Sequence, residues 1–393
     1  MSSAISNGAF PGSVFLVADK KNGVLYSNSF GYFTYDQNST PMSLQSKFDM
    51  ASVTKVISTT SATALLYQKG LIGLKDKVTK YYPDFAVNGK GEITIESLLL
   101  HNSGFPPDPD PWYSSTAFGC PATKFYHPPQ EFTCASKIYT SWINQVLQNK
   151  PGQVYVYSDL SMISMMYIIG QVVEKNMALL GMTKADLRED CIQQIGLTAP
   201  GYETCYYEAF VRKHVFGTLQ MTRSGFIPKP EEKSTIPPTW MDNSYHHELI
   251  QGFVSDENCY AQGGVAGHAG LFAPIVDVYR FMNELMFRTR GVFLNETTFT
   301  TFTTVKNVTQ SSRALGWDTN AEGNGSCGSL SKKTFLHLGF TGTQVCGDPD
   351  RQLFTIFLTN RVYPDKDNNK MSPVRNAVNS EVQKVYDQYY SSL

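Results

Sequence analysis

The feature that most constrains this chain is a serine and a lysine three residues apart in an apolar segment, "FDMASVTKVIST" at residues 48–59. Lysine is costly to bury, and a segment rich in Ser and Thr is a poor exposed helix. In a helix, positions i and i+3 share one face, with Cβ atoms about 5–6 Å apart. Lys55 can therefore accept the proton of Ser52 if burial keeps its amine partly neutral, which would make Ser52 a nucleophile. The alternative, an N-cap serine beside a surface lysine, is common by chance.

A second segment, "PGQVYVYSDLSMIS" at residues 151–164, places Tyr157 and Asp159 where a loop containing Pro and Gly meets an expected helix. A tyrosine held there can share proton transfer with a lysine, and Asp159 can orient polar groups. The simpler alternative is a turn followed by a helix N-cap, because serine and aspartate are favoured at both places.

A third segment, "FLHLGFTGT" at residues 335–343, puts His337 and Gly339 on a strand that leads a C-terminal meander. A glycine on such a strand lets a substrate carbonyl approach the backbone closely. The N–H of Phe340 is then a candidate oxyanion donor, together with the N–H of Ser52 at the positive end of its helix. Taken alone, His337 fits a structural strand histidine better than a catalyst.

The composition argues against several partners and sites. The 393 residues carry a formal net charge of −1 with no long basic or acidic run, so neither nucleic acid nor an anionic membrane surface is indicated. No apolar run is long enough to span a bilayer, and the N-terminus lacks the basic region of a signal peptide, so we expect a cytoplasmic protein. The seven cysteines are scattered without a CxxC pair, which predicts neither a zinc site nor a dense disulfide framework.

Both ends of the chain favour strands. Residues 13–32, "SVFLVADKKNGVLYSNSFGY", hold two β-prone runs around Asn22 and Gly23, a hairpin signal because both turn residues accept positive φ. Residues 333–361 predict an antiparallel meander with a turn at "GDPDRQ". One sheet built from both ends is the simplest arrangement.

The last helix is expected to have Ser372 as its N-cap and Pro373 at its first position. One apolar stripe would cover the sheet, formed by Val374, Val378, Val382, Val385 and Tyr389. We therefore expect an α/β lobe of residues 1–75 and 275–393, with a mainly helical lobe of residues 76–274 inserted into it. A cleft between two lobes is a common place for a site.

The three segments occur in the order Ser-x-x-Lys, a Tyr-led triplet and a variant of Lys-Thr-Gly, which resembles the motif set of β-lactamases and penicillin-binding proteins. Further segments along nearly the whole chain resemble the class C β-lactamase-type serine hydrolases, among them "FPGSVFLVAD", "ITIESLLLHNSGFP", "GGVAGHAGLFAP", "SRALGWDT" and "HLGFTGTQVCGDPDRQLFTIFLTNRVYP". That family also holds D-Ala carboxypeptidases, D-aminopeptidases and esterases. The resemblance implies an α/β (α+β) β-lactamase/transpeptidase-like fold, an antiparallel sheet flanked by helices with the inserted helical lobe.

The resemblance also assigns roles to individual residues. Ser52 matches the acylated serine, Lys55 its partner base and Tyr157 the tyrosine of the Tyr-x-Asn motif, while His337 and Gly339 match the ends of the Lys-Thr-Gly motif. The implied reaction is acyl transfer to water through an acyl-enzyme on Ser52, without a metal or an organic cofactor. The partner would be a small-molecule or peptide substrate, and the sequence leaves the oligomeric state open.

Three departures from the family's motifs bear on the substrate. Asp159 stands where Asn is usual, His337 replaces the lysine and Leu338 replaces the threonine. Together they remove a cation and a hydroxyl from carboxylate recognition, although Arg361 near the last strand is a candidate replacement. The substrate therefore stays open among β-lactams, D-amino-acid peptides and small esters. The alternative function is a non-hydrolysing, penicillin-binding-like protein that binds peptidoglycan fragments or acts as a scaffold.

Overall fold

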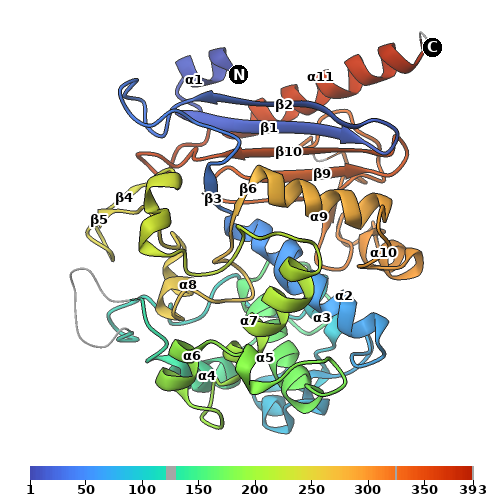
Figure 1. Cartoon of the computed structure of the whole chain (residues 1–393). Helices are drawn as coiled ribbons and strands as arrows, with labels where there is room; N and C mark the ends of the chain where they lie inside the picture. Colours follow the sequence, from blue (N-terminus) through green and yellow to red (C-terminus); the bar gives the residue numbers. More distant parts are fainter. Residues whose placement is uncertain (121–129, 324, 392–393) are drawn as a thin grey trace.

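A computed structural model describes residues 1–120, 130–323 and 325–391. A six-stranded antiparallel sheet crosses the top of the molecule in Figure 1, in the order β2-β1-β10-β9-β8-β7. Its strands come from both ends of the chain: β1 (Gly12–Asp19), β2 (Gly23–Gly31), β7 (Asp318–Thr319), β8 (Phe335–Leu338), β9 (Gln344–Asp348) and β10 (Leu353–Thr359). The shared sheet, the N-terminal hairpin and the C-terminal meander are therefore confirmed, and with them the mixed α/β fold class.

The N-terminal hairpin has a longer turn than its Asn-Gly pair predicts. Three residues, 20–22, lie between the paired ends Asp19 and Gly23. Gly23 has a φ of +73°, whereas Asn22 does not adopt positive φ and instead donates its N–H to the Asp19 carboxylate at 2.6 Å. The capped loop replaces the two-residue turn.

Helices cover both faces of the sheet (Figure 1). On one face, α9 (Ile275–Phe287) packs against β1 and β10. On the other face lie α1 (Ser2–Ser6) and α11 (Met371–Ser391). All of β1 is buried for this reason, with alternate side chains entering the two apolar clusters.

Two expectations for α11 are wrong. The helix already begins at Met371, so Ser372 lies inside its first turn and is not the N-cap. The apolar stripe also follows different positions from those expected near the end of the helix. Val374, Val378 and Val382 pack on the sheet as expected, but the stripe continues through Tyr386, while Val385 and Tyr389 are more than half exposed. The i+4 step from Val382 fits the helix period better than the i+3 step.

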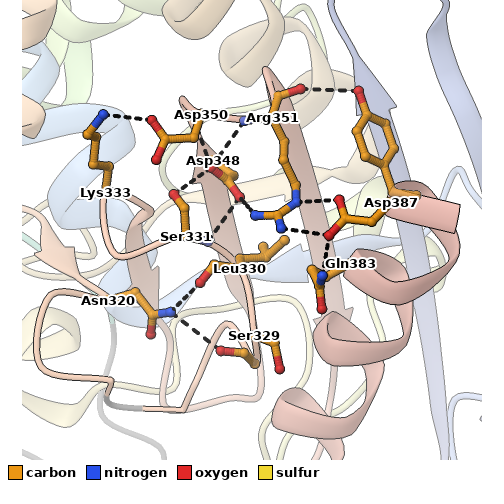
Figure 2. A network of polar contacts seen from close by, with 12 residues as sticks. Asn320, Ser329, Leu330, Ser331, Lys333, Asp348, Asp350, Arg351, Gln383 and Asp387 are labelled. Atoms are coloured by element: carbon orange, nitrogen blue, oxygen red, sulfur yellow. Dashed lines mark hydrogen bonds and ion pairs between the residues drawn. The ribbon is translucent and has the colours of Figure 1, made fainter. Parts of the chain in front are cut away.

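A polar network fixes α11 to the sheet (Figure 2). The Arg351 guanidinium donates two hydrogen bonds to Asp387 on α11, at 2.8 and 2.7 Å, and a third to Asp348 at the end of β9, at 3.0 Å. Asp348 also accepts from the N–H and hydroxyl of Ser331. This bidentate geometry holds the "GDPDRQ" turn, α11 and the segment before β8 together.

The rest of the chain is mainly helical and lies below the sheet in Figure 1. It contains α2 (Ser61–Gln68), α3 (Ile95–Leu99), α4 (Ala135–Asn144), α5 (Asp159–Lys175), α6 (Glu189–Ile195), α7 (Glu203–Phe210), α8 (Glu257–Ala261) and α10 (Glu296–Thr303). Two short strand pairs accompany them: β3 (Lys47–Asp49) with β6 (Phe272–Pro274), and β4 (Met241–Asp242) with β5 (Glu248–Leu249). The lobe boundaries given above stay a prediction.

The buried helix α5 organises this part. Ser158 is its N-cap and accepts the N–H of Ser161. At Gly170, an added Cβ would lie 2.1 Å from the carbonyl oxygen of Glu203, so only glycine lets α5 and α7 approach this closely. No helix among the described residues is both long and apolar enough to cross a membrane.

The scattered cysteines form disulfides that the sequence did not predict, although not a dense framework. Six of the seven cysteines form three disulfides, Cys120–Cys134, Cys191–Cys205 and Cys327–Cys346. Cys259 is a buried free thiol. Spacings of 14 and 19 residues carry no motif, and only the fold brings these pairs together.

Candidate active site

Ser52 is presented by a tight turn between β3 and the helical segment that continues into α2. Ala51 has a φ of +46°, a conformation that side chains rarely adopt. The buried carboxylate of Asp49 holds this turn by accepting the Ala51 N–H at 2.9 Å and the Ser255 N–H at 2.8 Å. Ser52 therefore stands on the first turn of the helical segment, as the sequence predicts, and the strain beside it is locked by a buried acceptor.

The strand β8 and the loop after it are fastened to the same turn. The hydroxyls of Thr341 and Thr343 donate to the carbonyls of Asp49 and Met50, at 2.7 and 2.9 Å. An added Cβ on Gly339 would lie 1.9 Å from Thr343 Oγ1 and 2.6 Å from the Met50 carbonyl oxygen. Glycine is needed at 339 for this packing, a different reason from the substrate approach inferred from the sequence.

Lys55 is fully buried and touches Ser52 directly. Its Nζ lies 2.8 Å from Ser52 Oγ, 3.0 Å from the His268 carbonyl oxygen and 2.7 Å from Asp159 Oδ1. Burial disfavours the charged amine, but the Asp159 carboxylate outweighs it and raises the pKa of Lys55 well above its usual value, with Tyr157 acting in the same sense. The condition of a partly neutral amine is therefore not met in the resting site, where the Asp159 carboxylate favours the ammonium form of Lys55.

Tyr157 lies against this lysine and is held from behind by a histidine. The Lys55 Nζ is 5.0 Å from the centre of the Tyr157 ring, and the centre of the His101 ring lies 4.7 Å from the centre of the Tyr157 ring. His101 accepts the N–H of Ser158 at Nδ1 (3.1 Å), so it also fixes the backbone beside the tyrosine. Burial, with the charges of Arg313 and Lys55, lowers the pKa of His101 well below its usual value.

His337 is buried on β8 and is neutral. Burial first, then the charges of Arg313 and Lys55, lowers its pKa well below the usual value. Its Nδ1 lies 3.0 Å from the Leu338 carbonyl oxygen, and its Nε2 has no partner among the described residues. It does not replace the cation that the family's lysine would supply.

The backbone after His337 provides a free donor at Phe340. The Gly339 N–H is occupied by the Thr343 carbonyl at 2.8 Å. The Phe340 N–H has no hydrogen-bond partner within the described chain, and the Phe340 side chain is half exposed, stacked edge-on against Trp240. Phe340, rather than Gly339, is thus the available backbone donor next to Ser52.

These groups surround one cavity of about 620 Å³. Six of the seven residues inferred from the sequence line it, and the seventh, Lys55, lies beneath it in contact with Ser52. The lining consists of Ser52, Tyr155, Tyr157, Asp159, Asp256, Arg313, Asp318, Leu336, His337, Leu338, Gly339, Phe340, Arg361, Asn368, Asn369, Met371, Ser372 and Arg375.

A second layer of charge lies under Asp159. Asp256 pairs with buried His268 at 3.0 Å. Burial disfavours the charged form of both groups, but the charge of each partner favours the charged form of the other. The pKa of Asp256 is therefore lowered and that of His268 is raised. Asp108 has its pKa raised to about 6 by burial and by the charges of Asp159 and Asp256. Side-chain atoms of Asp159, Asp256 and His268 lie within 4.8 Å of one another, a spacing that suits a cation. Lys55 already pairs with Asp159, and His268 already pairs with Asp256. The donor set therefore fits ion pairs rather than a metal.

Sequence reasoning missed several residues of this site. Arg313, Tyr155 and Asp256 line the cavity, and His101 supports Tyr157. Arg313 lies in the quoted segment "SRALGWDT", but nothing in that segment distinguishes it from the chain's other arginines. The positions of these four residues depend on long-range packing that no local sequence pattern encodes.

Comparisons with known proteins concern the family and the fold. The β-lactamase family model matches residues 3–380. A protein of Escherichia coli strain K12 named "Putative D-alanyl-D-alanine carboxypeptidase" is 28% identical over 375 residues, which cover 89% of this chain and 78% of that protein. A protein of the same name from Salmonella agona is 28% identical over 390 residues, covering 92% and 81%.

Solved structures share the fold. EstCE1, a hydrolase with promiscuous acyltransferase activity, superposes with a TM-score of 0.68 at 19% identity, covering 96% of both chains. The LovD6 mutant of simvastatin synthase from Aspergillus terreus gives 0.67 at 17% identity, covering 99% of this chain and 95% of that one. The octameric penicillin-binding protein homologue from Pyrococcus abyssi gives 0.58 at 17% identity, covering 94% and 74%. At these identities the structural likeness concerns the β-lactamase/transpeptidase-like fold.

Proposed function

Because the chain belongs to the β-lactamase family and is a serine hydrolase of that family, we propose that it cleaves amide or ester bonds through an acyl-enzyme on Ser52. The observation that carries the proposal is the 2.8 Å contact between Ser52 Oγ and the buried Nζ of Lys55, beside the cavity of about 620 Å³. A buried cation in contact with a serine hydroxyl favours the alkoxide that attacks the acyl carbon.

The Ser52 proton moves along a chain of three side chains. Ser52 Oγ, Lys55 Nζ and Asp159 Oδ1 follow one another at 2.8 and 2.7 Å. As Ser52 attacks, Lys55 takes its proton and passes one of its own to Asp159, so the lysine is never left as a neutral amine. Asp159 thus changes from an expected substrate-binding residue to a member of the proton path.

The same geometry provides for the charge on the acyl oxygen and for the leaving group. The N–H groups of Ser52 and Phe340 stabilise the oxyanion, because both residues line the cavity and the loop after β8 is bonded to the turn of Ser52. Tyr157, held over Lys55, donates a proton to the leaving group. The same steps in reverse then release the acyl group. A water molecule gives a proton to Tyr157 as it attacks the acyl carbon, and Asp159 returns a proton through Lys55 to Ser52.

The substrate class is a peptide-like amide or a small ester. The curated relatives carry the name "Putative D-alanyl-D-alanine carboxypeptidase", and the solved neighbours include a hydrolase with promiscuous acyltransferase activity. These names, together with a cavity large enough for a dipeptide, favour an acyl-amino-acid or acyl-ester substrate over a macromolecule.

Intact-protein mass spectrometry after reaction with a fluorophosphonate, and separately with a penicillin, tests the proposal. We expect one adduct on wild type and none on Ser52→Ala. Persistent penicillin labelling would indicate a peptidase-like site, and drug hydrolysis by unlabelled protein would indicate rapid deacylation. A wild-type protein that reacts with neither reagent would overturn the proposal and favour the alternative, a non-hydrolysing binding protein.

We further propose that the chain folds in an oxidising compartment, in place of the cytoplasm expected from its composition. Three disulfides support this, because such bonds are rare in cytosolic proteins of most organisms. Thiol titration of the denatured, unreduced native protein is expected to find one reactive thiol, Cys259. A count of seven would restore the cytoplasmic assignment.

A further inference from the structure

Four Asn-x-Ser/Thr tripeptides, the acceptor sequence for N-glycosylation, begin at Asn38, Asn295, Asn307 and Asn324, and none has proline at its second position. Such tripeptides also occur by chance, and they matter only in a chain that enters a secretory pathway. The three disulfides support a compartment of that kind. Asn324 lies outside the described residues.

The other three acceptor sequences lie on the surface, in loops or at the start of a helix. In each, the asparagine and the threonine at the third position are both exposed, as Asn38 with Thr40, Asn295 with Thr297 and Asn307 with Thr309. N-linked sugars are bulky, so only a nitrogen that faces solvent can carry one in the folded chain. None of these three asparagines lines the active-site cavity.

The hydrogen bonds of Asn295 leave its amide nitrogen available. Asn295 is the N-cap of α10, and its Oδ1 accepts the N–H of Thr298 at 2.8 Å. The cap uses the oxygen alone, and Nδ2 has no partner within the described residues. A sugar on Nδ2 therefore preserves the cap, because the amide oxygen remains an acceptor.

Asn307 shows the same division between its two side-chain atoms. Its Oδ1 accepts the hydroxyl of Thr309, the threonine of its own acceptor sequence, at 2.6 Å. Its Nδ2 is again without a partner in the part of the chain that the structure describes. The Asn307 carbonyl accepts the N–H groups of Gln310 and Ser311, at 3.0 and 3.1 Å, so a bonded turn presents the exposed side chain.

Asn38 uses its amide nitrogen in one hydrogen bond at the surface. Its Nδ2 donates to Asp36 Oδ1 at 3.1 Å, and its backbone N–H donates to the same oxygen at 2.9 Å. Glycosylation replaces one of the two N–H groups on Nδ2, and the other can keep this bond. All three side chains can therefore carry a sugar without losing a contact of the fold.

We propose that Asn38, Asn295 and Asn307 are N-glycosylation sites, modified as the chain enters the oxidising compartment proposed above. An oligosaccharide carried on a lipid pyrophosphate supplies the sugar. Nδ2 forms a bond to the anomeric carbon while the bond from that carbon to the pyrophosphate oxygen breaks. The lipid pyrophosphate leaves, the Nδ2 proton goes to a base of the transferase, and nothing is oxidised or reduced. The inference does not use the chemistry at Ser52, so either can fail without the other.

Peptide mapping of protein purified without reductant from the organism that makes it tests the inference. An amidase that cleaves the sugar from asparagine, used in heavy-oxygen water, converts each glycosylated asparagine to an oxygen-labelled aspartate. We expect the label at positions 38, 295 and 307, with a matching fall in the intact mass. Unmodified asparagine at these positions would overturn the inference. Thiol titration of the same sample then shows whether the oxidising compartment fails with it.

Matched threonine variants test the site that also caps a helix. Thr297→Ala removes the acceptor sequence of Asn295 but not its cap, so the label at position 295 should be lost completely. Thr297→Ser retains the hydroxyl and should retain the label. Both variants should still show one reactive thiol, Cys259, which indicates that they fold with their disulfides. A label at position 295 that survives in Thr297→Ala would come from deamidation and would overturn the assignment of this site.

Discussion

The two sides of the active-site cavity each contain a buried cation, and the two cations are treated differently. On one side, Lys55 is enclosed by Ser52, Asp159 and the His268 carbonyl, all within 3.0 Å. On the other side, Arg313 donates to one tyrosine hydroxyl, and its nearest carboxylate stays 3.8 Å away.

The two cations thus differ in how many partners lie at hydrogen-bond distance. A cation that must change its proton within a reaction needs fixed partners at hydrogen-bond distance, because reorganisation would slow each step. The following predictions test this contrast, starting with the largest effect.

Removal of the nucleophile should have the largest effect. Ser52→Ala is expected to reduce kcat for ester hydrolysis by about 10³-fold or more, because the chain Ser52–Lys55–Asp159 then has nothing to activate. Steady-state kinetics on the phenyl ester of hippuric acid provide the measurement. Activity within tenfold of wild type, in protein with an unchanged Tm, would contradict the assignment.

The loss of the partner of Lys55 should come second. Asp159→Asn removes the carboxylate that holds Lys55 as an ammonium ion, so the lysine pKa falls. Because Asp159 is the terminal proton acceptor in our account, kcat should fall by about 10- to 100-fold at every pH from 6 to 9. Asp108→Asn, which removes a nearby carboxylate that has no contact with Lys55, is the matched control and should stay within a few-fold.

The opposite result for Asp159→Asn would be informative. If a neutral Lys55 were the direct base, the lower lysine pKa would increase activity at neutral pH and shift the alkaline rise of kcat to lower pH. A gain of that kind would contradict the proton chain and restore the mechanism first suggested by the sequence.

We expect the smallest effect from the substitution of Glu203, a buried carboxyl group that forms no ion pair within the described residues. Glu203 is 2% exposed and accepts the Tyr82 hydroxyl at 3.0 Å, and burial raises its pKa from 4.5 to about 7. The folded protein thus holds a proton that the unfolded chain loses as the pH rises above about 4.5, so the free energy of unfolding falls between pH 4.5 and 7. Glu203→Gln should be stabilising by about 2–3 kcal/mol at pH 8.5 and near neutral at pH 4.5.

Urea unfolding at the two pH values measures this difference. Exposed Glu189→Gln is the control and should change stability by less than about 0.5 kcal/mol at either pH. A stabilisation by Glu203→Gln that does not depend on pH would show that folding does not raise the pKa of Glu203.

The sheet and much of the site could be predicted from the sequence, because both depend on local sequence patterns. β-prone runs around the Asn-Gly pair and around the "GDPDRQ" turn predicted the hairpin and the meander, and the Ser52–Lys55 spacing placed two reacting groups on one helical face. The order of the motifs along the chain predicted that Tyr157 and His337 share a site, and both line the cavity.

The remainder depends on pairs that are distant in the chain. The charge state of Lys55 is set by Asp159, more than 100 positions away, and the disulfides and Arg313 are likewise placed by tertiary packing. At the C-terminal helix, the sequence predicted the element but missed its first residue and the turn of its stripe, because Val385 and Tyr386 both suit an apolar face.

The most direct measurement is acid quenching of the wild-type enzyme during turnover of the phenyl ester of hippuric acid, followed by peptide mapping. Our account predicts a hippuryl group on Ser52, in the peptide that contains both Ser52 and Lys55, and its absence in Ser52→Ala. A hippuryl group on another residue, or turnover without any covalent adduct in a quench fast enough to resolve one cycle, would contradict it.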